Sequence, residues 1–359
     1  MKLIKNGLIV FGSLCFVMLA LEIVFRFLPV RSVLHTDVLN DAKPIPSYLA
    51  NEKGVWSRDW NFSIVNTLVT NNLGFVNPQD YGKTDKPAVA VIGDSFVEAA
   101  MTPYDRTFYG RLAAKLRPEN TLVYTFAMSG AQLPDYLVWA RYAIGHFAPQ
   151  KMVFVIIPND YDESLAKNKQ SPGSYYFYDN KDKSLSLGKV DFAISPLRRF
   201  VRSSALLGYI TQNLQVWERL KEFLYDSQRL TGTLDTKAWI ADAKRAVDFF
   251  FDELDKAVRI DHKDVLCLID GSIEDVYGKG NDTPRIKGRD AADAYLAQVA
   301  RNHGYRVIEL PSIFRKHYQA HGQPLVYPTD GHWNELAHQL VYETILGSDL
   351  LATPQPPQP

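Results

Sequence analysis

Short runs of apolar residues alternate along most of this chain with longer segments in which apolar residues recur at the helical period. We expect buried strands at residues 88–92, 122–126, 152–157, 264–269 and 306–309. Between and after them the pattern predicts helices at 108–116, 133–147, 289–303, 312–320 and 334–346. Strands that are apolar throughout and alternate with helices are typical of a parallel sheet covered on both faces. The pattern therefore predicts an α/β fold.

The first 28 residues differ, because apolar residues follow one another there almost without a break. The run over residues 7–28 is interrupted by a serine, Glu22 and Arg26, and two lysines precede it. About 20 apolar residues span the hydrocarbon core of a bilayer. We therefore expect a single-pass membrane anchor over 1–28, with the body of the chain outside the cytoplasm. A cleaved signal peptide is the alternative, although the residues before Ala20 place a large side chain where cleavage favours a small one.

Two further parts of the chain differ from the anchor and from the alternating strands and helices. The segment after the anchor is polar and contains several prolines, and alternation at 63–70 predicts one strand near its end. The last eight residues are of low complexity and rich in proline, and we expect them to be disordered. The predicted units are an anchor, a tether with one strand, an α/β domain and a tail, over residues 1–28, 29–85, 86–351 and 352–359.

An insertion interrupts the α/β pattern over about 163–260. It contains the aromatic run 175–178 and two amphipathic helices, predicted over roughly 203–226 and 236–258. We expect this insertion to form a cap that binds substrate. Its aromatic residues, among them Trp217 and Trp239, either pack within the cap or stack against a sugar.

Charge and cysteine content exclude some classes of function. Lys plus Arg and Asp plus Glu both number 40, so the chain lacks the basic excess that nucleic-acid binding usually requires. Its two cysteines, Cys15 and Cys267, lie in very different settings, the first in the anchor and the second in a predicted strand. We expect neither an intramolecular disulfide nor a zinc site built from cysteines.

The candidate chemistry lies at the ends of predicted strands. Ser95 follows the strand at 88–92 in Gly93-Asp94-Ser95-Phe96, and far downstream Asp330 and His332 form part of a second polar cluster. Loops that leave the carboxyl ends of parallel strands line the functional crevice of such sheets. A serine with a distant histidine and aspartate provides a nucleophile, a general base and an orienting carboxylate. Asp270 also ends a predicted strand and is a second candidate for the orienting acid.

Two further strand ends offer hydrogen-bond donors. Gly130 follows the second predicted strand and Asn159 follows the third. Ester cleavage requires preorganised donors around the oxyanion of a tetrahedral intermediate. The backbone N–H groups of Ser95 and Gly130 and the side-chain amide of Asn159 can converge on one such point. Gly130 suits this role because glycine lets the backbone approach a ligand closely.

These motifs, in this order and spacing, resemble the SGNH (GDSL) hydrolase superfamily over about residues 86–350. Gly93-Asp94-Ser95-Phe96 resembles its first block, Gly130 its second, Asn159-Asp160 its third and the cluster with Asp330 and His332 its last. The resemblance implies a flavodoxin-like, three-layer α/β/α fold. It also implies Ser95 as nucleophile, His332 as base and Asp330 as its orienting acid, and it implies neither a metal nor an organic cofactor.

The chain departs from that family pattern at two positions. Ile157 stands two residues before Asn159, where glycine is usual, and Thr329 stands three residues before His332, where aspartate is usual. Asp330 is instead two residues before the histidine. The Asp-x-His-Trp form and the N-terminal anchor resemble the branch linked to O-acetylation of cell-surface polysaccharides, including alginate.

The sequence thus predicts an envelope-anchored, periplasmic or extracytoplasmic serine esterase or O-acyltransferase that acts on acyl esters, with acetylated carbohydrate as the expected substrate. A membrane acyltransferase or a polysaccharide-assembly protein is a candidate partner. One alternative is a non-catalytic carbohydrate-binding or scaffold subunit, and another is an esterase for lipid acyl groups. Four neighbouring residues are expected to be structural: Asp94 and Asp160 as braces of their loops, Asn334 as a helix cap and His338 as a packing residue.

Overall fold

The computed structural model describes residues 2–161, 163–193, 195, 203–216, 236–271, 276–278 and 284–351. Two of the regions considered above lie outside these residues. One is the tail at 352–359, and the other is residues 217–226 of the first amphipathic helix, including Trp217.

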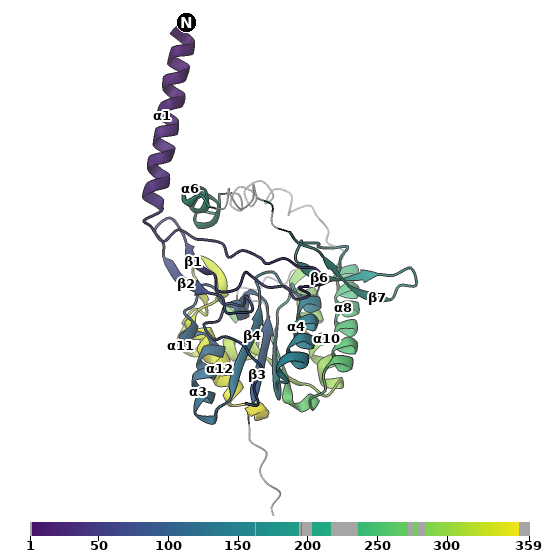
Figure 1. Cartoon of the computed structure of the whole chain (residues 1–359). Coiled ribbons are helices and arrows are strands. Elements are labelled where there is room, and N and C mark those ends of the chain that lie inside the picture. The colour runs from purple at the N-terminus through teal and green to yellow at the C-terminus, as the bar shows by residue number, and fades with distance from the viewer. Residues whose placement is uncertain are drawn as a thin grey trace, which may run out of the picture.

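A five-stranded parallel sheet forms the centre of the molecule (Figure 1). Its order is β4-β3-β5-β8-β9, which is the flavodoxin-like order 2-1-3-4-5 when the five strands are numbered along the chain. Every pair in the sheet is parallel. The five strands that the sequence predicts are confirmed, with the bounds Ala88–Gly93 (β3), Leu122–Ala127 (β4), Lys151–Ile156 (β5), Val265–Ile269 (β8) and Arg306–Glu309 (β9).

Helices cover both faces of this sheet, as predicted for a three-layer α/β/α arrangement. Alternate residues of one strand point to opposite faces, so Ala90 and Ile92 of β3 join one apolar cluster and Val91 joins the other. The first cluster includes α4 (Leu133–Phe147), α8 (Thr236–Ala257) and α10 (Pro284–Asn302). The second includes α3 (Phe108–Leu116), α11 (Leu310–His321) and α12 (Glu335–Leu346).

The helix predicted over 236–258 forms as α8, but it is not part of a cap. Its apolar stripe, which includes Ala243, Val247, Phe250 and Leu254, is fully buried in the first cluster. Phe250 meets Phe154 of β5 edge to face, with ring centroids 5.9 Å apart. α8 therefore packs against both α4 and α10 on this face of the sheet. This corrects the expected insertion over 163–260, because its second half is core.

The segment 29–85 is also more ordered than the predicted tether. It contains the antiparallel strands β1 (Lys53–Arg58) and β2 (Ile64–Val69), of which only the second was expected. Leu34, Trp56 and Phe75 are buried in the same cluster as one face of the sheet. Trp139 of α4 donates a hydrogen bond to the carbonyl of Pro46 at 2.9 Å. These contacts show that the segment is folded against the body, because its apolar residues complete the core.

The aromatic run at 175–178 lies in a hairpin that the sequence analysis did not anticipate. Its strands are β6 (Ser174–Asp179) and β7 (Leu185–Val190), which pair in antiparallel register. Tyr176 and Phe177 are buried, and the Tyr175 hydroxyl donates to the carbonyl of Pro44 at 2.7 Å. Trp239 packs against the first apolar cluster. The aromatic residues of this region that the structure describes therefore pack within the protein.

The N-terminal helix α1 (Lys2–Phe25) projects from the body (Figure 1). Its segment Ile4–Phe25 has a mean hydropathy of 2.6 and is long and apolar enough to cross a membrane. The short helix α6 (Ala205–Gly208) lies beside its last turn. The described chain also contains single-turn elements at Tyr104–Arg106, Arg117–Glu119, Tyr209–Asn213, His262–Asp264 and Asp349–Leu351.

Candidate active site

The turn that presents Ser95 is held by its immediate neighbours. β3 ends at Gly93, and the one-turn helix α2 (Ser95–Glu98) begins directly afterwards. A Cβ atom at Gly93 would lie 2.3 Å from Val97 Cγ2, so only glycine allows this close return of the chain. Asp94 caps α2 by accepting the Phe96 N–H at 2.9 Å, and its Oδ2 lies 3.1 Å from Ser95 Oγ. Asp94 thus braces the turn, as expected.

Asp330 and His332 lie on the short strand β11 (Asp330–Trp333), which pairs with β10 (Val326–Tyr327). Residues two apart on a strand point to the same face. This explains why an acid two positions before the histidine can serve it. Asp330 Oδ1 accepts from His332 Nδ1 and also from the backbone N–H of His332 at 3.2 Å.

The structure brings the three residues together in the order that a catalytic triad requires. His332 Nε2 lies 2.8 Å from Ser95 Oγ, across 237 positions of sequence. On its other side the imidazole bonds to Asp330, whose side chain is only 1% exposed. A histidine held in this way presents Nε2 to a serine hydroxyl as a proton acceptor. Ser95, His332 and Asp330 therefore lie where the sequence analysis expects them.

Arg58 completes the surroundings of Asp330 and was not anticipated. Its Nη2 lies 3.5 Å from Asp330 Oδ2, and its Nε donates to the carbonyl of Thr329 at 3.1 Å. Burial raises the pKa of Asp330, but the bond from His332 and the charges of His332 and Arg58 outweigh it and lower that pKa. Asp330 is therefore held as a carboxylate. Arg58 lies on β1, where no local sequence pattern signals such a role.

Asp270, the second candidate for the orienting acid, has a different partner. Its Oδ2 accepts from Trp333 Nε1 at 3.1 Å, and burial raises its pKa to about 7. Trp333 itself is almost fully buried and meets Phe96 and Phe314 edge to face. The structure thus places Asp270 against the tryptophan next to His332, where it fixes the loop rather than the imidazole.

The candidate oxyanion donors lie at the carboxyl edge of the sheet. Gly93 pairs with Ala127, so Ser95 and Gly130 follow the ends of neighbouring parallel strands. Gly130 has a φ of +81°, a left-handed conformation that favours glycine. Within the described residues, neither its N–H nor the side-chain amide of Asn159 has a hydrogen-bond partner.

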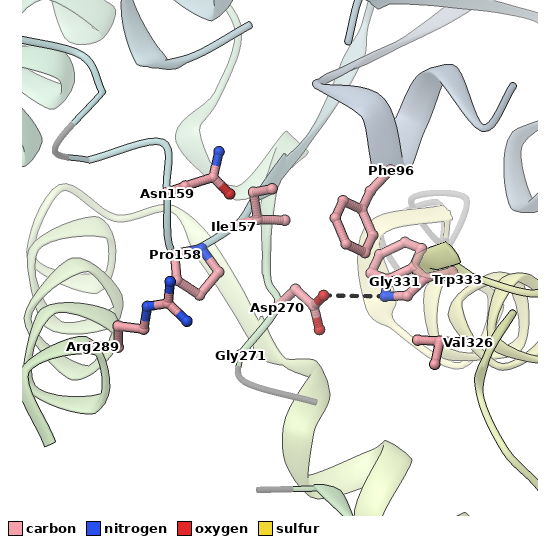
Figure 2. Close-up of a pocket in the computed structure, with 10 residues that line it drawn as sticks. All are labelled: Phe96, Ile157, Pro158, Asn159, Asp270, Gly271, Arg289, Val326, Gly331 and Trp333. Atoms are coloured by element: carbon pink, nitrogen blue, oxygen red, sulfur yellow. Dashed lines mark hydrogen bonds between the residues drawn. The ribbon is translucent and has the colours of Figure 1, made fainter. Parts of the chain in front are cut away.

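A pocket of about 120 Å³ lies beside the triad (Figure 2). Neither Ser95 nor His332 lines it, but their neighbours Phe96, Gly331 and Trp333 do. Its other walls are Ile157, Pro158, Asn159, Asp270, Gly271, Arg289 and Val326. Ile157, one departure from the family pattern, is thus an apolar wall of this pocket. Arg289 adds a cation that the sequence analysis did not single out.

The other polar residues near the motifs have structural roles. Asn334 caps α12 by accepting the N–H groups of Leu336 and Ala337 at 3.0 and 3.1 Å. Asp160 is fully buried and accepts from the backbone N–H of Ile157 and from a tyrosine hydroxyl, both at 2.9 Å. His338 is buried against the ring of Phe108, and burial lowers its pKa to about 3. The three expectations for these residues are confirmed.

Two further expectations concern the cysteines and metal binding. Cys15 and Cys267 are both free, and burial raises the pKa of the Cys267 thiol to about 12. Within the described ranges, no group of histidine, cysteine and carboxylate side chains is arranged to hold a metal ion.

No model of a known protein family matches the chain, and no curated protein matches its sequence. Solved structures that do match include an α/β hydrolase enzyme from the metagenome of Lake Arreo, Spain, with 14% identity, a TM-score of 0.41, and coverage of 74% of this chain and 95% of that one. An acetyl xylan esterase matches at 12% identity with a TM-score of 0.38, covering 72% and 98% of the two chains.

A lipolytic protein of the G-D-S-L family from Veillonella parvula matches at 11% identity with a TM-score of 0.37, covering 72% and 96% of the two chains. The proteins to which this chain is similar thus include the type of hydrolase that its motifs resemble. At such TM-scores the likeness carries no argument about activity.

Proposed function

We propose that this protein is a serine esterase or O-acyltransferase that uses Ser95, His332 and Asp330. The observation that supports this most strongly is the 2.8 Å contact between Ser95 Oγ and His332 Nε2, with the imidazole bonded to the buried Asp330 on its other side. A serine hydroxyl is a weak nucleophile unless a base takes its proton. This arrangement supplies that base in the required orientation.

The reaction then follows from the positions of these groups. His332 accepts the proton of Ser95 as Oγ attacks the carbonyl carbon of an ester, and the resulting imidazolium is stabilised by Asp330. The N–H groups of Ser95 and Gly130 and the amide of Asn159 stabilise the oxyanion. When the intermediate collapses, the ester C–O bond breaks, His332 returns the proton to the leaving alcohol and the acyl group stays on Ser95.

The second half of the reaction decides between hydrolase and transferase. Either water or a sugar hydroxyl attacks the acyl-enzyme, and His332 again acts first as base and then as acid. The pocket supports a short acyl group such as acetyl, because it is small and has apolar walls at Ile157, Val326 and Phe96. Acetylated carbohydrate is the proposed substrate, as the resemblance of the motifs implies.

We further propose that α1 is retained as a membrane anchor and that the catalytic body lies in the periplasm or otherwise outside the cytoplasm. Support comes from the last turn of α1, since Glu22 accepts hydrogen bonds from Ala205 and Leu206 of the body at 3.1 and 2.9 Å. Such contacts are expected of a helix that stays attached to the folded body. A membrane acyltransferase or polysaccharide-assembly protein remains the proposed partner.

The test is the release of acetate from p-nitrophenyl acetate by the full chain in detergent micelles. Ser95→Ala and His332→Ala should each lower kcat by roughly 10³-fold or more, because each removes a member of the triad. Ser312→Ala changes an exposed serine on α11 and should leave the rate unchanged. Equal background rates in all four folded proteins would contradict the esterase and favour the non-catalytic carbohydrate-binding subunit. Faster turnover of long-chain esters would favour the lipid esterase.

A further inference from the structure

The exposed apolar residues of the body gather in two segments. Outside residues 4–28, the described chain exposes six large apolar side chains. Three belong to the β1–β2 hairpin and three to the segment 203–216, and we call them together the anchor-side surface: Trp60, Val65, Val69, Leu207, Ile210 and Val216. Trp60 is the most exposed of them, at 73%. Such a concentration of exposed apolar residues marks an interaction surface.

Hydrogen bonds and stacking fix this surface to the end of α1. Glu22 accepts from the Ser204 hydroxyl at 2.8 Å, in addition to the two backbone N–H groups described above. The ring of Phe25 stacks on Tyr209 with centroids 4.3 Å apart. The Tyr209 hydroxyl donates to the carbonyl of Trp60 at 2.9 Å. The two segments are therefore attached to each other and to the helix.

A close backbone contact reinforces this attachment. A Cβ atom at Gly208 would lie 3.3 Å from both the Arg31 carbonyl and Val30 Cγ1. Glycine at this position lets α6 pack directly on the chain that leaves α1. Figure 1 shows α6 beside the lower end of that helix. The body is thus held against the end of the anchor, with no free tether between them.

The dimensions of the helix place these residues at the surface of a bilayer. At about 1.5 Å per residue, the 24 residues of α1 are about 36 Å long, and the hydrocarbon core of a bilayer is about 30 Å thick. The last turn therefore reaches the headgroup region, which is about 5–8 Å thick on each side. Anything in direct contact with that turn lies within or next to this region.

We propose that the anchor-side surface rests on the membrane and is covered by lipid. The inference rests on the proposed anchoring by α1. We infer lipid as its occupant from continuity with that helix, because Tyr209 stacks on Phe25 in the last turn of α1 and donates to the carbonyl of Trp60. Tryptophan and tyrosine concentrate at membrane interfaces, where an apolar ring and a polar group are both accommodated. Leu207 and Ile210, three positions apart, present one apolar face there, like an interfacial helix.

This contact sets the position of the active site relative to the membrane. Asn213, in the same segment, is fully buried and donates to Ser57 Oγ at 2.7 Å. The next residue along β1, Arg58, pairs with Asp330 at 3.5 Å. A body docked in this way holds the triad in a fixed orientation above the lipid. Its substrate therefore has to be accessible close to the membrane surface.

The test measures lipid contact at single positions of the full chain. A Cys15→Ser background removes the exposed cysteine and leaves only the buried Cys267. Ile210→Cys or Val216→Cys is then labelled with an environment-sensitive fluorophore, and the chain is reconstituted in phosphatidylcholine and phosphatidylglycerol vesicles with or without doxyl-labelled lipid. Lys115→Cys on α3 is the matched control, since this exposed residue lies on a helix distant from α1 (Figure 1).

We expect labels at positions 210 and 216 to lose most of their emission when doxyl lipid is present, and the label at 115 to keep its emission. Flotation with the vesicles and p-nitrophenyl acetate turnover are measured in the same samples. Labels at 210 and 216 that stay as exposed to water as the control, in a chain that floats and turns over substrate, would overturn the docking and leave the proposed function intact. Labels shielded without quenching would show a second copy on the surface and would also overturn it. A chain that does not float would overturn both the anchoring and the docking.

Discussion

The two halves of the triad are held in place in very different ways. Ser95 depends on residues next to it, because Gly93 permits the tight turn and Asp94 caps the helix that follows. Asp330 and His332 depend on distant residues. Arg58 donates to the carbonyl of Thr329, next to Asp330, across 271 positions of sequence. Asp270 accepts a hydrogen bond from Trp333, the residue that follows His332.

This difference shows which part of an active site a short motif encodes. The nucleophile turn is a local structure at the end of a regular strand, so its motif contains nearly everything needed to form it. The acid and base lie on a two-strand ribbon whose position depends on the N-terminal segment. Substitution of residues that support Asp330 and His332 from a distance, such as Arg58, should therefore impair catalysis, although no motif contains these residues.

The largest expected effect distinguishes the two aspartates of the second half. Asp330→Asn should lower kcat by roughly 10³–10⁴-fold, because the amide no longer holds His332 in the tautomer that accepts a proton from Ser95. Asp270→Asn is the matched variant, and its side-chain oxygen can still accept from Trp333. It should lower kcat far less. Steady-state hydrolysis of p-nitrophenyl acetate measures both, and the opposite ranking would make Asp270 the orienting acid.

A stability measurement tests the assignment of α8 to the core that supports Ser95. Leu254→Ala removes a fully buried side chain and should lower the free energy of unfolding by about 2–5 kcal/mol. Asp252→Ala, at an exposed position of the same helix, should change it little. Urea unfolding followed by tryptophan fluorescence reports the difference. If both variants unfolded like the unmodified chain, α8 would be a separate cap, as first expected.

A smaller effect should follow from Arg58, which positions Asp330 without touching substrate. Arg58→Gln should lower kcat by roughly tenfold, equivalent to about 1.4 kcal/mol, and leave KM nearly unchanged. The charge of Arg58 helps to lower the pKa of Asp330. Its removal should raise the pKa of Asp330, so the acidic limb of the activity profile should move to higher pH.

The control for Arg58 is Lys53→Gln, an exposed cation at the other end of β1. It should preserve both kcat and the position of the acidic limb. An Arg58→Gln profile that superimposes on this control would show that the N-terminal segment has no part in positioning the acid. The contrast between the two halves of the triad would then disappear.

Most of the central fold could be predicted from the sequence, for a physical reason. β3, β5 and β8 are buried on both faces, so they appear as unbroken apolar runs, and amphipathic helices separate them. The place of Asp330 was also predictable, because residues two apart on a strand share a face. The clustering of Ser95 with His332 followed from the rule that the carboxyl ends of parallel strands meet at one edge.

The parts that were missed depend on contacts between distant segments. In β1 the polar Ser57 is buried beside Val55 and Trp56 because Asn213 satisfies it, and this hides the usual alternation of a strand. The core position of α8 was missed because an amphipathic helix looks the same whether it covers a sheet or a substrate. Arg58 was missed because its partners, Thr329 and Asp330, are far away in sequence.

The central claim is that His332 and Asp330 activate Ser95 as a nucleophile, and covalent trapping tests it most directly. A fluorophosphonate reacts with an activated serine hydroxyl, because Oγ displaces fluoride and a stable phosphonyl ester forms. The full chain is treated in detergent, and the adduct is mapped by peptide mass spectrometry beside His332→Ala. The account predicts one rapidly formed adduct, on Ser95, that forms far more slowly in the variant. An adduct on another serine, or equal labelling of Ser95 in both proteins, would contradict it.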